Sequence, residues 1–489
     1  MSLLIVLPIV APLAATALSL LVRPWPRVRD AVTLSGLLAA FAAAVALLVR
    51  VEANGTHRLR VGEWNPELGI ELVADLFAVL VLPVALGVIV LVELFSIGQR
   101  RTRWAADPQL VGPLLGVLTS GVSLSMLTGD LFTLFVSFEL ILVASYVLLT
   151  HQGTRAQIRS GMTYVAMNLL ASTLFLLGTA FVYTATGTVN LALLAERLPE
   201  LESGVKLGIG AWFFVVFGTK AAVFPLFSWL PDSYPTAPTT ITAVFAGLLT
   251  KIGVYAMIRF HTMTQMDELG PVLLVVAGLT MLIGAVGALA QGDMKRILSF
   301  HVISQIGYML MGLGLFSTAG LTGAIVFLVH HMPVKTVLFL VGGLIEGSEG
   351  SSDLDRIGGL AGRRPIVAAL FAVPAISLAG LPPFSGFVAK LGVISAGVEA
   401  SEALVVAAAL VAGVLTLLSM TKIWIGVFWG ASTDDDDLQP RGSSRAMTAA
   451  TALAVAGTIG ISLAAGGLFE LAGRAALELQ GLEQVEVGS

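Results

Sequence analysis

Cysteine is absent from the 489-residue sequence, which excludes disulfide bonds, thiolate-held iron–sulfur clusters and thiol catalysis. Charged residues are scarce as well: they make up 12% of the chain, whereas soluble domains carry about 25%. Hydrophobic residues make up 56%. This composition predicts a polytopic membrane protein.

Lysine is also rare, with seven residues against twenty arginines. The arginines gather in short polar gaps between apolar stretches. Five lysines lie inside those stretches, namely Lys220, Lys251, Lys335, Lys390 and Lys422. An ammonium inside a bilayer is costly unless it is paired, hydrated or neutralised. Because a buried lysine can lose its proton and an arginine effectively cannot, this distribution indicates a protein that moves protons.

About fourteen apolar segments are long enough to cross a membrane, since each crossing needs roughly 20 residues. They are expected near residues 3–22, 31–49, 72–97, 109–128, 131–150, 160–184, 206–230, 238–260, 271–290, 296–316, 320–345, 366–394, 402–430 and 447–470. The longest gap, around 52–71, includes Asn54-Gly55-Thr56, which is interpreted as a polar turn, and the acidic run 434–437 is interpreted as a solvated loop. We therefore predict an all-α polytopic membrane protein.

The basic residues in the gaps predict the orientation. Fifteen follow odd-numbered segments and six follow even-numbered ones. The six are Arg50, Arg58, Arg60, Arg197, Lys206 and Arg259. Because cytoplasmic loops carry an excess of lysine and arginine, the odd gaps should be cytoplasmic and both termini extracytoplasmic.

Short motifs occur twice in the same order, at offsets of 157 to 171 residues. The paired motifs are Gly129-Asp130 and Gly292-Asp293, Phe224-Pro225-Leu226-Phe227-Ser228 and Leu381-Pro382-Pro383-Phe384-Ser385, and Thr250-Lys251-Ile252 and Thr421-Lys422-Ile423. The two copies are offset by five membrane-spanning segments. Because five is an odd number of crossings, the two copies must have opposite orientations in the membrane. The pattern therefore predicts two inverted five-helix repeats, a common transporter plan.

This repeat divides the chain into four predicted parts. Segments one to three lie in residues 1–108, and the first repeat, segments four to eight, in 109–263. The second repeat, segments nine to thirteen, lies in 264–432. Segment fourteen and a tail occupy 433–489.

Each repeat contains a predicted discontinuous helix beside a lysine. Pro225 and Pro231 follow Lys220, and Pro382 and Pro383 precede Lys390. Proline removes a backbone donor and interrupts a helix, which leaves carbonyl groups that need other partners. Broken helices at corresponding positions of two repeats are typical of an ion site.

Further ionisable residues extend the candidate path. Glu139 lies in the middle of an apolar segment, where pairing with a lysine on a neighbouring helix would be least costly. His331 and Lys335 are four residues apart and share a helical face. Other possible members are His301, His330, Lys422 and Glu93. The adjacent histidines have no third ligand at suitable spacing, so no metal site or cofactor is expected.

Several of these segments resemble the antiporter-like subunits, the superfamily that contains the proton-pumping membrane subunits of respiratory complex I and the large subunits of Mrp-type sodium/proton antiporters. The resemblance covers nearly the whole chain. It is carried by the Glu139 segment, the Lys220 segment running into Trp229-Leu230-Pro231-Asp232-Ser233-Tyr234, Leu249-Thr250-Lys251-Ile252-Gly253, Asp293-Met294-Lys295-Arg296, and Leu381-Pro382-Pro383-Phe384-Ser385-Gly386-Phe387 with Lys390.

The resemblance implies roles for these residues. Glu139 would pair with Lys220, Lys251 would continue a proton path, and Lys390 would open the far half-channel. His331 and Lys335 match the family's histidine and lysine on the eleventh span.

Within this family, the run from Pro231 to Thr239 with phenylalanine at 227 resembles the D-type Mrp subunit. That assignment implies a sodium/proton antiporter subunit in a prokaryotic inner membrane, beside an A-like large subunit and small membrane subunits, with no nucleic acid bound. An N- or M-type subunit of complex I, or of a related membrane-bound hydrogenase, is the alternative, and only then would the protein belong to an enzyme. Two other classes of protein are disfavoured. A redox enzyme would need haem, flavin or cluster ligands, and the sequence contains no such set. A passive scaffold would tolerate apolar residues at 139, 220, 251 and 390, whereas all four positions are ionisable.

Overall fold

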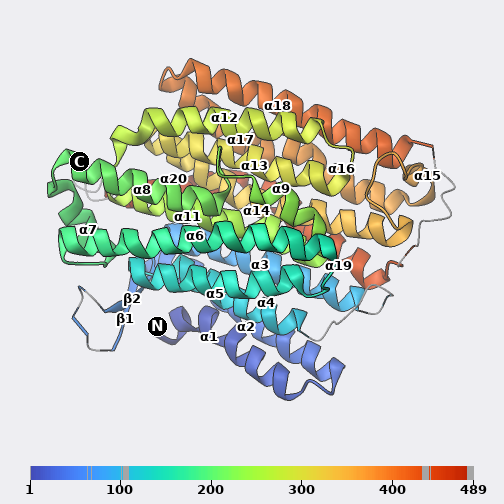
Figure 1. Cartoon of the computed structure of the whole chain (residues 1–489), viewed down its shortest axis with the longest axis horizontal. Coiled ribbons are helices and arrows are strands. Elements are labelled where there is room, and N and C mark those ends of the chain that lie inside the picture. The colour runs from blue at the N-terminus through green and yellow to red at the C-terminus, as the bar shows by residue number, and fades with distance from the viewer. Residues whose placement is uncertain are drawn as a thin grey trace.

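A computed structural model describes residues 2–62, 64–65, 67, 69–100, 102, 110–431, 440 and 442–481. These residues form mainly helices that lie side by side along the long axis of the molecule (Figure 1). The acidic run 434–437 lies outside the described residues. The helices before the first predicted repeat are α1 (Ser2–Leu21), α2 (Pro26–Asn54) and α3 (Leu76–Gln99).

The remaining helices follow the predicted segments closely. Residues 109–263 form α4 (Val111–Leu127), α5 (Leu131–Thr150), α6 (Arg155–Thr186), α7 (Leu191–Arg197), α8 (Ser203–Ala221), α9 (Trp229–Ser233), α10 (Thr239–Val244) and α11 (Thr250–Met263). Later residues form α12 (Gly270–Leu289), α13 (Met294–Gly314), α14 (Thr318–Glu349), α15 (Leu360–Arg363), α16 (Pro365–Ala379), α17 (Ser385–Glu399), α18 (Ala403–Ile423), α19 (Arg445–Leu463) and α20 (Ala465–Leu479).

The number of crossings agrees with the predicted fold class. Among the described residues, twelve helices are long and apolar enough to span a membrane. The shorter α4 and the interrupted pair α16–α17 each add one crossing, which gives the expected fourteen. The part of the chain that the structure describes is therefore all-α apart from one small hairpin, as expected for a polytopic membrane protein.

That hairpin occupies most of the gap around 52–71, where the sequence predicted no strand, and Asn54-Gly55-Thr56 lies at the turn between α2 and β1. Strands β1 (His57–Val61) and β2 (Ile70–Ala74) pair antiparallel, with His57 opposite Ala74. β2 is buried along most of its length, while β1 stays largely exposed. A five-residue strand with one buried neighbour leaves too short a pattern to distinguish from a loop in sequence.

We call the end of the bundle that carries this hairpin the hairpin end. The N-terminus lies beside the two strands in Figure 1. At the other terminus, the Glu478 carboxylate accepts a hydrogen bond of 3.1 Å from the backbone N–H of Leu76, at the start of α3. Both ends of the described chain thus lie at the hairpin end. The opposite end, with Arg29, Arg100 and Arg296, is called the arginine end.

The last crossing extends further than predicted. Instead of one segment at 447–470 followed by a tail, α19 and α20 form a helix interrupted at Ala464 that reaches Leu479. α20 buries Ala472, Ala475 and Ala476 and packs against α14 and α3. Because charged residues on its other face interrupt the apolar pattern, no long apolar run marks α20 in the sequence.

Two local structures support the repeat. Asp130 caps the start of α5 by accepting from Thr133 N–H at 2.6 Å, and it forms a bridge with Asn190 at the hairpin end. Asp293 caps the start of α13 by accepting from Arg296 N–H at 2.9 Å, and it bridges Asp353 at the arginine end. Matching caps at opposite ends fit an inverted pair. We propose the division at 108, 263 and 432 on this basis.

Candidate functional site

Four buried lysines lie in the interior of the helix bundle, and each bonds to neutral oxygen atoms. Lys220 donates to Asn168 O at 3.2 Å and to Ser172 Oγ at 2.9 Å. The remaining contacts run from Lys251 to Ala246 O and Thr250 Oγ1, from Lys335 to Leu298 O, and from Lys390 to Ala379 O. Among the described residues, no carboxylate lies within 4.0 Å of any of the four ammonium groups. A buried lysine without a counter-charge is suited to give up its proton.

Lys220 adjoins a cavity that has room for one water molecule. The cavity measures about 20 Å³ and is lined by Lys220, Asn168, Tyr164 and Ile252, among others. One water needs roughly 10–15 Å³ by this measure and two or more polar partners, which this site supplies. Lys220 lies on α8, and Ile252 directly follows Lys251 on α11. The water-sized cavity therefore lies between the two helices that carry the first two lysines.

Glu139 and Lys220 do not form an ion pair in this structure. Glu139 is half-buried on α5, and its Oε1 atom has no hydrogen-bond partner. The ring of the preceding residue, Phe138, instead lies 5.5 Å from the Lys220 ammonium. Sequence spacing could not show this separation, because the direction of a side chain on α5 depends on how that helix rotates against α6 and α8.

The helix breaks position Lys220 and Lys390. Ala222, the residue after α8, has a left-handed φ of 60°, and Pro225 lies in the following break. Gly380, the residue after α16, has φ 87° and precedes Pro382 and Pro383. Both lysines therefore lie within a few residues of an interrupted helix, where carbonyl groups lack helical partners. Lys390 bonds to one of these carbonyls, that of Ala379.

Pro231 does not break a helix, contrary to the prediction. It lies in the first turn of the short α9, Trp229–Ser233. Backbone N–H groups in a first turn have no intrahelical acceptor, so a proline there costs no hydrogen bond.

The second break leaves no space for a side chain at Gly386. A Cβ atom built there would lie 1.7 Å from Ser377 O. We expect Gly386→Ala to force α16 and α17 apart and to destabilise the protein by about 1–3 kcal/mol or more, seen as a lower melting temperature.

Gly466→Ala is the matched control for this change. Gly466 also lies in a helix, and a Cβ atom there meets nothing within 4 Å. Equal melting temperatures for the two variants would contradict the proposed close packing at the second break.

The central part of the site is formed by α11, α13 and α14. Both ring nitrogens of the fully buried His331 lack a hydrogen-bond partner, which is unusual for a buried polar group and leaves the ring available to water. His331 and Lys335 lie one turn apart on α14, as the sequence predicted. Lys251 bonds to Ala246 O, in the segment 245–249 that packs against α14 at Met332 and Thr336.

The two other histidines lie toward the second break. His330 Nδ1 is 2.8 Å from Ser385 Oγ, the first residue of α17. His301 Nε2 is 2.6 Å from Ser419 Oγ on α18. The charge of Lys390 acts on both histidines, and its ammonium lies 5.2 Å from the ring centre of Tyr308. The structure thus brings His301 and His330 into the same buried region as Lys390.

Two further candidates lie away from this region. Lys422 donates to the carbonyls of Leu289 and Gln291 at 3.0 and 2.7 Å, at the end of α12. Its contacts are those of a helix cap. Glu93 is fully buried near the arginine end and pairs with Arg100 at 2.5 Å. It therefore takes part in a buried ion pair.

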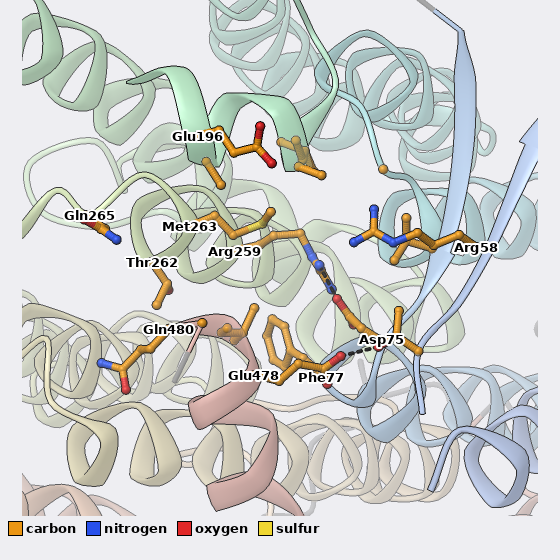
Figure 2. A pocket seen from close by; sticks show the side chains of 18 residues that line it. Arg58, Asp75, Phe77, Glu196, Arg259, Thr262, Met263, Gln265, Glu478 and Gln480 are labelled. Carbon is orange, nitrogen blue, oxygen red and sulfur yellow. Dashed lines mark hydrogen bonds and ion pairs between the residues drawn. The ribbon is translucent and has the colours of Figure 1, made fainter. Parts of the chain in front are cut away.

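The sequence interpretation missed a second buried ion pair. Arg259, counted as a loop residue, is buried near the end of α11 and binds both carboxylate oxygens of Asp75, with Nη2 to Oδ1 at 2.8 Å. Figure 2 shows the two side chains pointing toward each other at the hairpin end. The available signal was the position of Arg259 inside the apolar run 252–260, where an unpaired guanidinium would be costly.

Asp75 stays ionised because of this pairing. Burial alone would raise the pKa of its carboxyl, but the Arg259 guanidinium and the backbone N–H of Ala78 hold that pKa below its usual value of 3.8. A lowered folded-state pKa means that the stabilisation is fully present above the usual value and is lost only as pH falls through the lower folded value.

We therefore expect Asp75→Asn to destabilise the protein by about 3–5 kcal/mol, because it leaves Arg259 buried without a counter-charge. The decrease in melting temperature should be the same from about pH 6 to about pH 9, because this whole pH range lies above the pKa of the Asp75 carboxyl. Asp232→Asn is the control: its pair with Arg296 is exposed and 3.6 Å long, and should contribute about 0–1 kcal/mol. A loss for Asp75→Asn no larger than for Asp232→Asn would contradict the stabilising pair.

Comparison with known proteins identifies the family. Residues 128–416, more than half of the chain, match the model for the transmembrane family of NADH:quinone oxidoreductase and Mrp antiporter subunits. The chain belongs to this family. The D subunit of the Na⁺/H⁺ antiporter of Alkalihalophilus pseudofirmus is 42% identical over 434 residues, which cover 87% of each protein. The corresponding D subunit of Bacillus subtilis is 36% identical over 78% of each.

Solved structures of the family agree with the fold. A chain of the Mrp complex from Dietzia sp. DQ12-45-1b superposes with a TM-score of 0.91 at 34% identity, covering 98% of each chain. A chain of the membrane-bound sulfane sulfur reductase, an archaeal respiratory membrane complex, superposes with a TM-score of 0.88 at 25% identity, covering 99% of this chain and 98% of that one. The resemblance to D-type antiporter subunits is thereby confirmed, and the protein is a multi-pass membrane protein of this family.

Proposed function

We propose that this chain is the proton-translocating, D-type subunit of a multisubunit Na⁺/H⁺ antiporter. The observation that carries the proposal is that Lys220, Lys251, Lys335 and Lys390, all buried, bond only to neutral oxygens among the described residues. The names of the relatives at 42% and 36% identity support the exchange of sodium for protons.

The proposed path runs from Lys220 to Lys251, then through His331 and Lys335 to Lys390. The water-sized cavity beside Lys220 supports the first transfer. Electrostatic proximity supports the middle transfers, because Lys251 acts on His331 and Lys335. His301 and His330, which face Lys390, complete the far side. Proton transfer over these gaps needs bridging water, and the unpartnered nitrogens of His331 offer it binding sites.

Glu139 is proposed to act as a switchable counter-ion. When its carboxylate approaches Lys220, the ammonium is favoured, and when the two separate, Lys220 is favoured as the neutral amine. The arrangement described above, with no ion pair between them, corresponds to the separated state. Formation of the pair needs a rotation of α5 or a new Glu139 rotamer.

The proposed setting is a prokaryotic inner membrane, with the arginine end cytoplasmic and both termini extracytoplasmic. The partners are an A-like large subunit and small membrane subunits, and the chain acts as a transporter subunit without a cofactor. Sodium crosses elsewhere in the complex or along part of the same path.

The proposal is tested by sodium-driven proton flux in vesicles that contain the assembled complex. Lys251→Met keeps the length of the side chain and removes the amine, so flux should be lost while assembly stays normal. Lys422→Met is the matched control, because Lys422 caps α12 outside the path, and it should retain near wild-type flux. Equal flux in both variants would remove Lys251 from the path.

A further inference from the structure

A large cavity opens at the hairpin end, away from the four lysines. It measures about 580 Å³ and reaches the exposed side chains of Glu196 and Gln265, so it is open to the surroundings. Its lining is rich in charged and amide groups, and Figure 2 shows those of Arg58, Asp75, Glu196 and Arg259 around it. A polar cavity of this size holds many waters.

The Asp75–Arg259 pair lies at the edge of this cavity and also faces a second one. Arg259 lines both the large cavity and a smaller one of about 10 Å³ that includes Tyr255 and Ala256, one turn deeper on α11. The Tyr255 hydroxyl accepts from Arg259 Nη2 at 2.6 Å and donates to Met126 O at 2.7 Å. The pair is thus fixed from α3, α4 and α11.

The next cavity along α11 is the one beside Lys220. Ile252, one turn beyond Ala256, lines it. Phe260 borders the second cavity, and Phe138 borders the third. The ring of Phe217 contacts both of these rings, with a centroid distance of 6.0 Å to Phe260 and 6.4 Å to Phe138. Three cavities therefore follow one helix face from the hairpin end to Lys220, with the ion pair before the second cavity and aromatic rings before the third.

We propose that the Asp75–Arg259 pair is the gate of an access route along which water and protons reach Lys220 from the hairpin end. This inference rests on the role proposed above for Lys220. Separation of α3 from the end of α11 would open the floor of the large cavity. Glu196 lines the same cavity and offers Arg259 an alternative carboxylate, so the guanidinium keeps a counter-charge when the gate opens.

The absence of cysteine allows a direct test by single cysteine substitutions. Ala192→Cys marks the large cavity, Ala256→Cys the second cavity, and Met257→Cys a neighbouring buried position that lines none of the three. The probe is Ag⁺, a small monovalent cation that binds thiols, applied to one face of vesicles that hold the whole complex, with any cysteines of the other subunits replaced.

We expect fast reaction of Ala192→Cys from the hairpin side and slow reaction of Ala256→Cys from that side. In a background with Asp75→Asn and Arg259→Gln, which removes both charges together, the Ala256→Cys rate should rise about tenfold or more, because hydrogen bonds to charged groups stabilise the closed state by at least this factor. Met257→Cys should stay protected in both backgrounds.

The gate is overturned if Ala256→Cys is labelled from the hairpin side in neither background. It is also overturned if Ala256→Cys is labelled from the arginine side alone. Labelling of Met257→Cys in the double variant also overturns it, because α11 would then have loosened as a whole. Proton flux of Lys220→Ala is measured in parallel. Retained flux overturns the proposed function whatever the labelling, whereas lost flux without labelling of Ala256→Cys overturns the gate alone.

Discussion

Lys220→Ala and Lys390→Ala should each abolish sodium-driven proton flux while the complex assembles normally. Both ammonium groups are buried beside a broken helix and bond to neutral oxygens. Alanine removes the only protonatable group at each position, and a water-filled gap cannot store a proton there. Because neither lysine has a carboxylate partner within 4.0 Å among the described residues, its removal leaves no orphaned charge, and stability should fall little.

The measurement is proton flux driven by a sodium gradient, with complex assembly and melting temperature recorded for each variant. Lys206→Ala serves as a control, because Lys206 pairs with Glu268 at 2.9 Å near the surface and lies outside the path. Near wild-type flux in Lys220→Ala or Lys390→Ala would remove that residue from the path. A loss of assembly would instead assign it a structural role.

Glu139→Gln should prevent proton loading of Lys220 and so abolish flux, if Glu139 acts as a switchable counter-ion. Glutamine keeps the size of the side chain and removes its charge, so the ammonium form of Lys220 would lose its only proposed partner. Glu139→Asp keeps the charge but is shorter by one methylene, and we expect reduced flux. The series is measured as sodium-driven proton flux at about pH 7 to about pH 9, where an ordinary carboxyl is fully ionised.

The double variant Glu139→Gln with Lys220→Met separates the switch from packing. It removes both charges, so stability should match the wild type while transport stays lost. Because Glu139 Oε1 has no partner in the structure, its substitution should not break an existing contact. Wild-type flux in Glu139→Gln throughout this pH range would eliminate the switch and leave Glu139 as a packing residue.

Local sequence determined most of the helical architecture. α5 has the predicted bounds, 131–150, because its apolar run begins directly after the capping Asp130 and both signals are local. The breaks at Pro225 and at Pro382 and Pro383 were also predictable, since proline acts on its own turn. The hairpin β1–β2 was not, because a five-residue strand with one buried face is too short a pattern to distinguish from a loop. Helix α20 was not either, because its buried alanines pack against α14 and α3, which are far away in the chain.

The tertiary structure alone decided which ionisable groups meet. The sequence singled out Glu139 and Lys220 by their position in apolar segments, but only the packing of the helices decided that Phe138, and not Glu139, contacts the Lys220 ammonium. The sequence also did not indicate that Asp75 pairs with Arg259, because the two residues are 184 positions apart in the chain. Composition and local pattern fix which residues are buried in the membrane, because transfer from water depends on each segment by itself. The contact between two buried charges depends on how several helices pack, and this no segment determines alone.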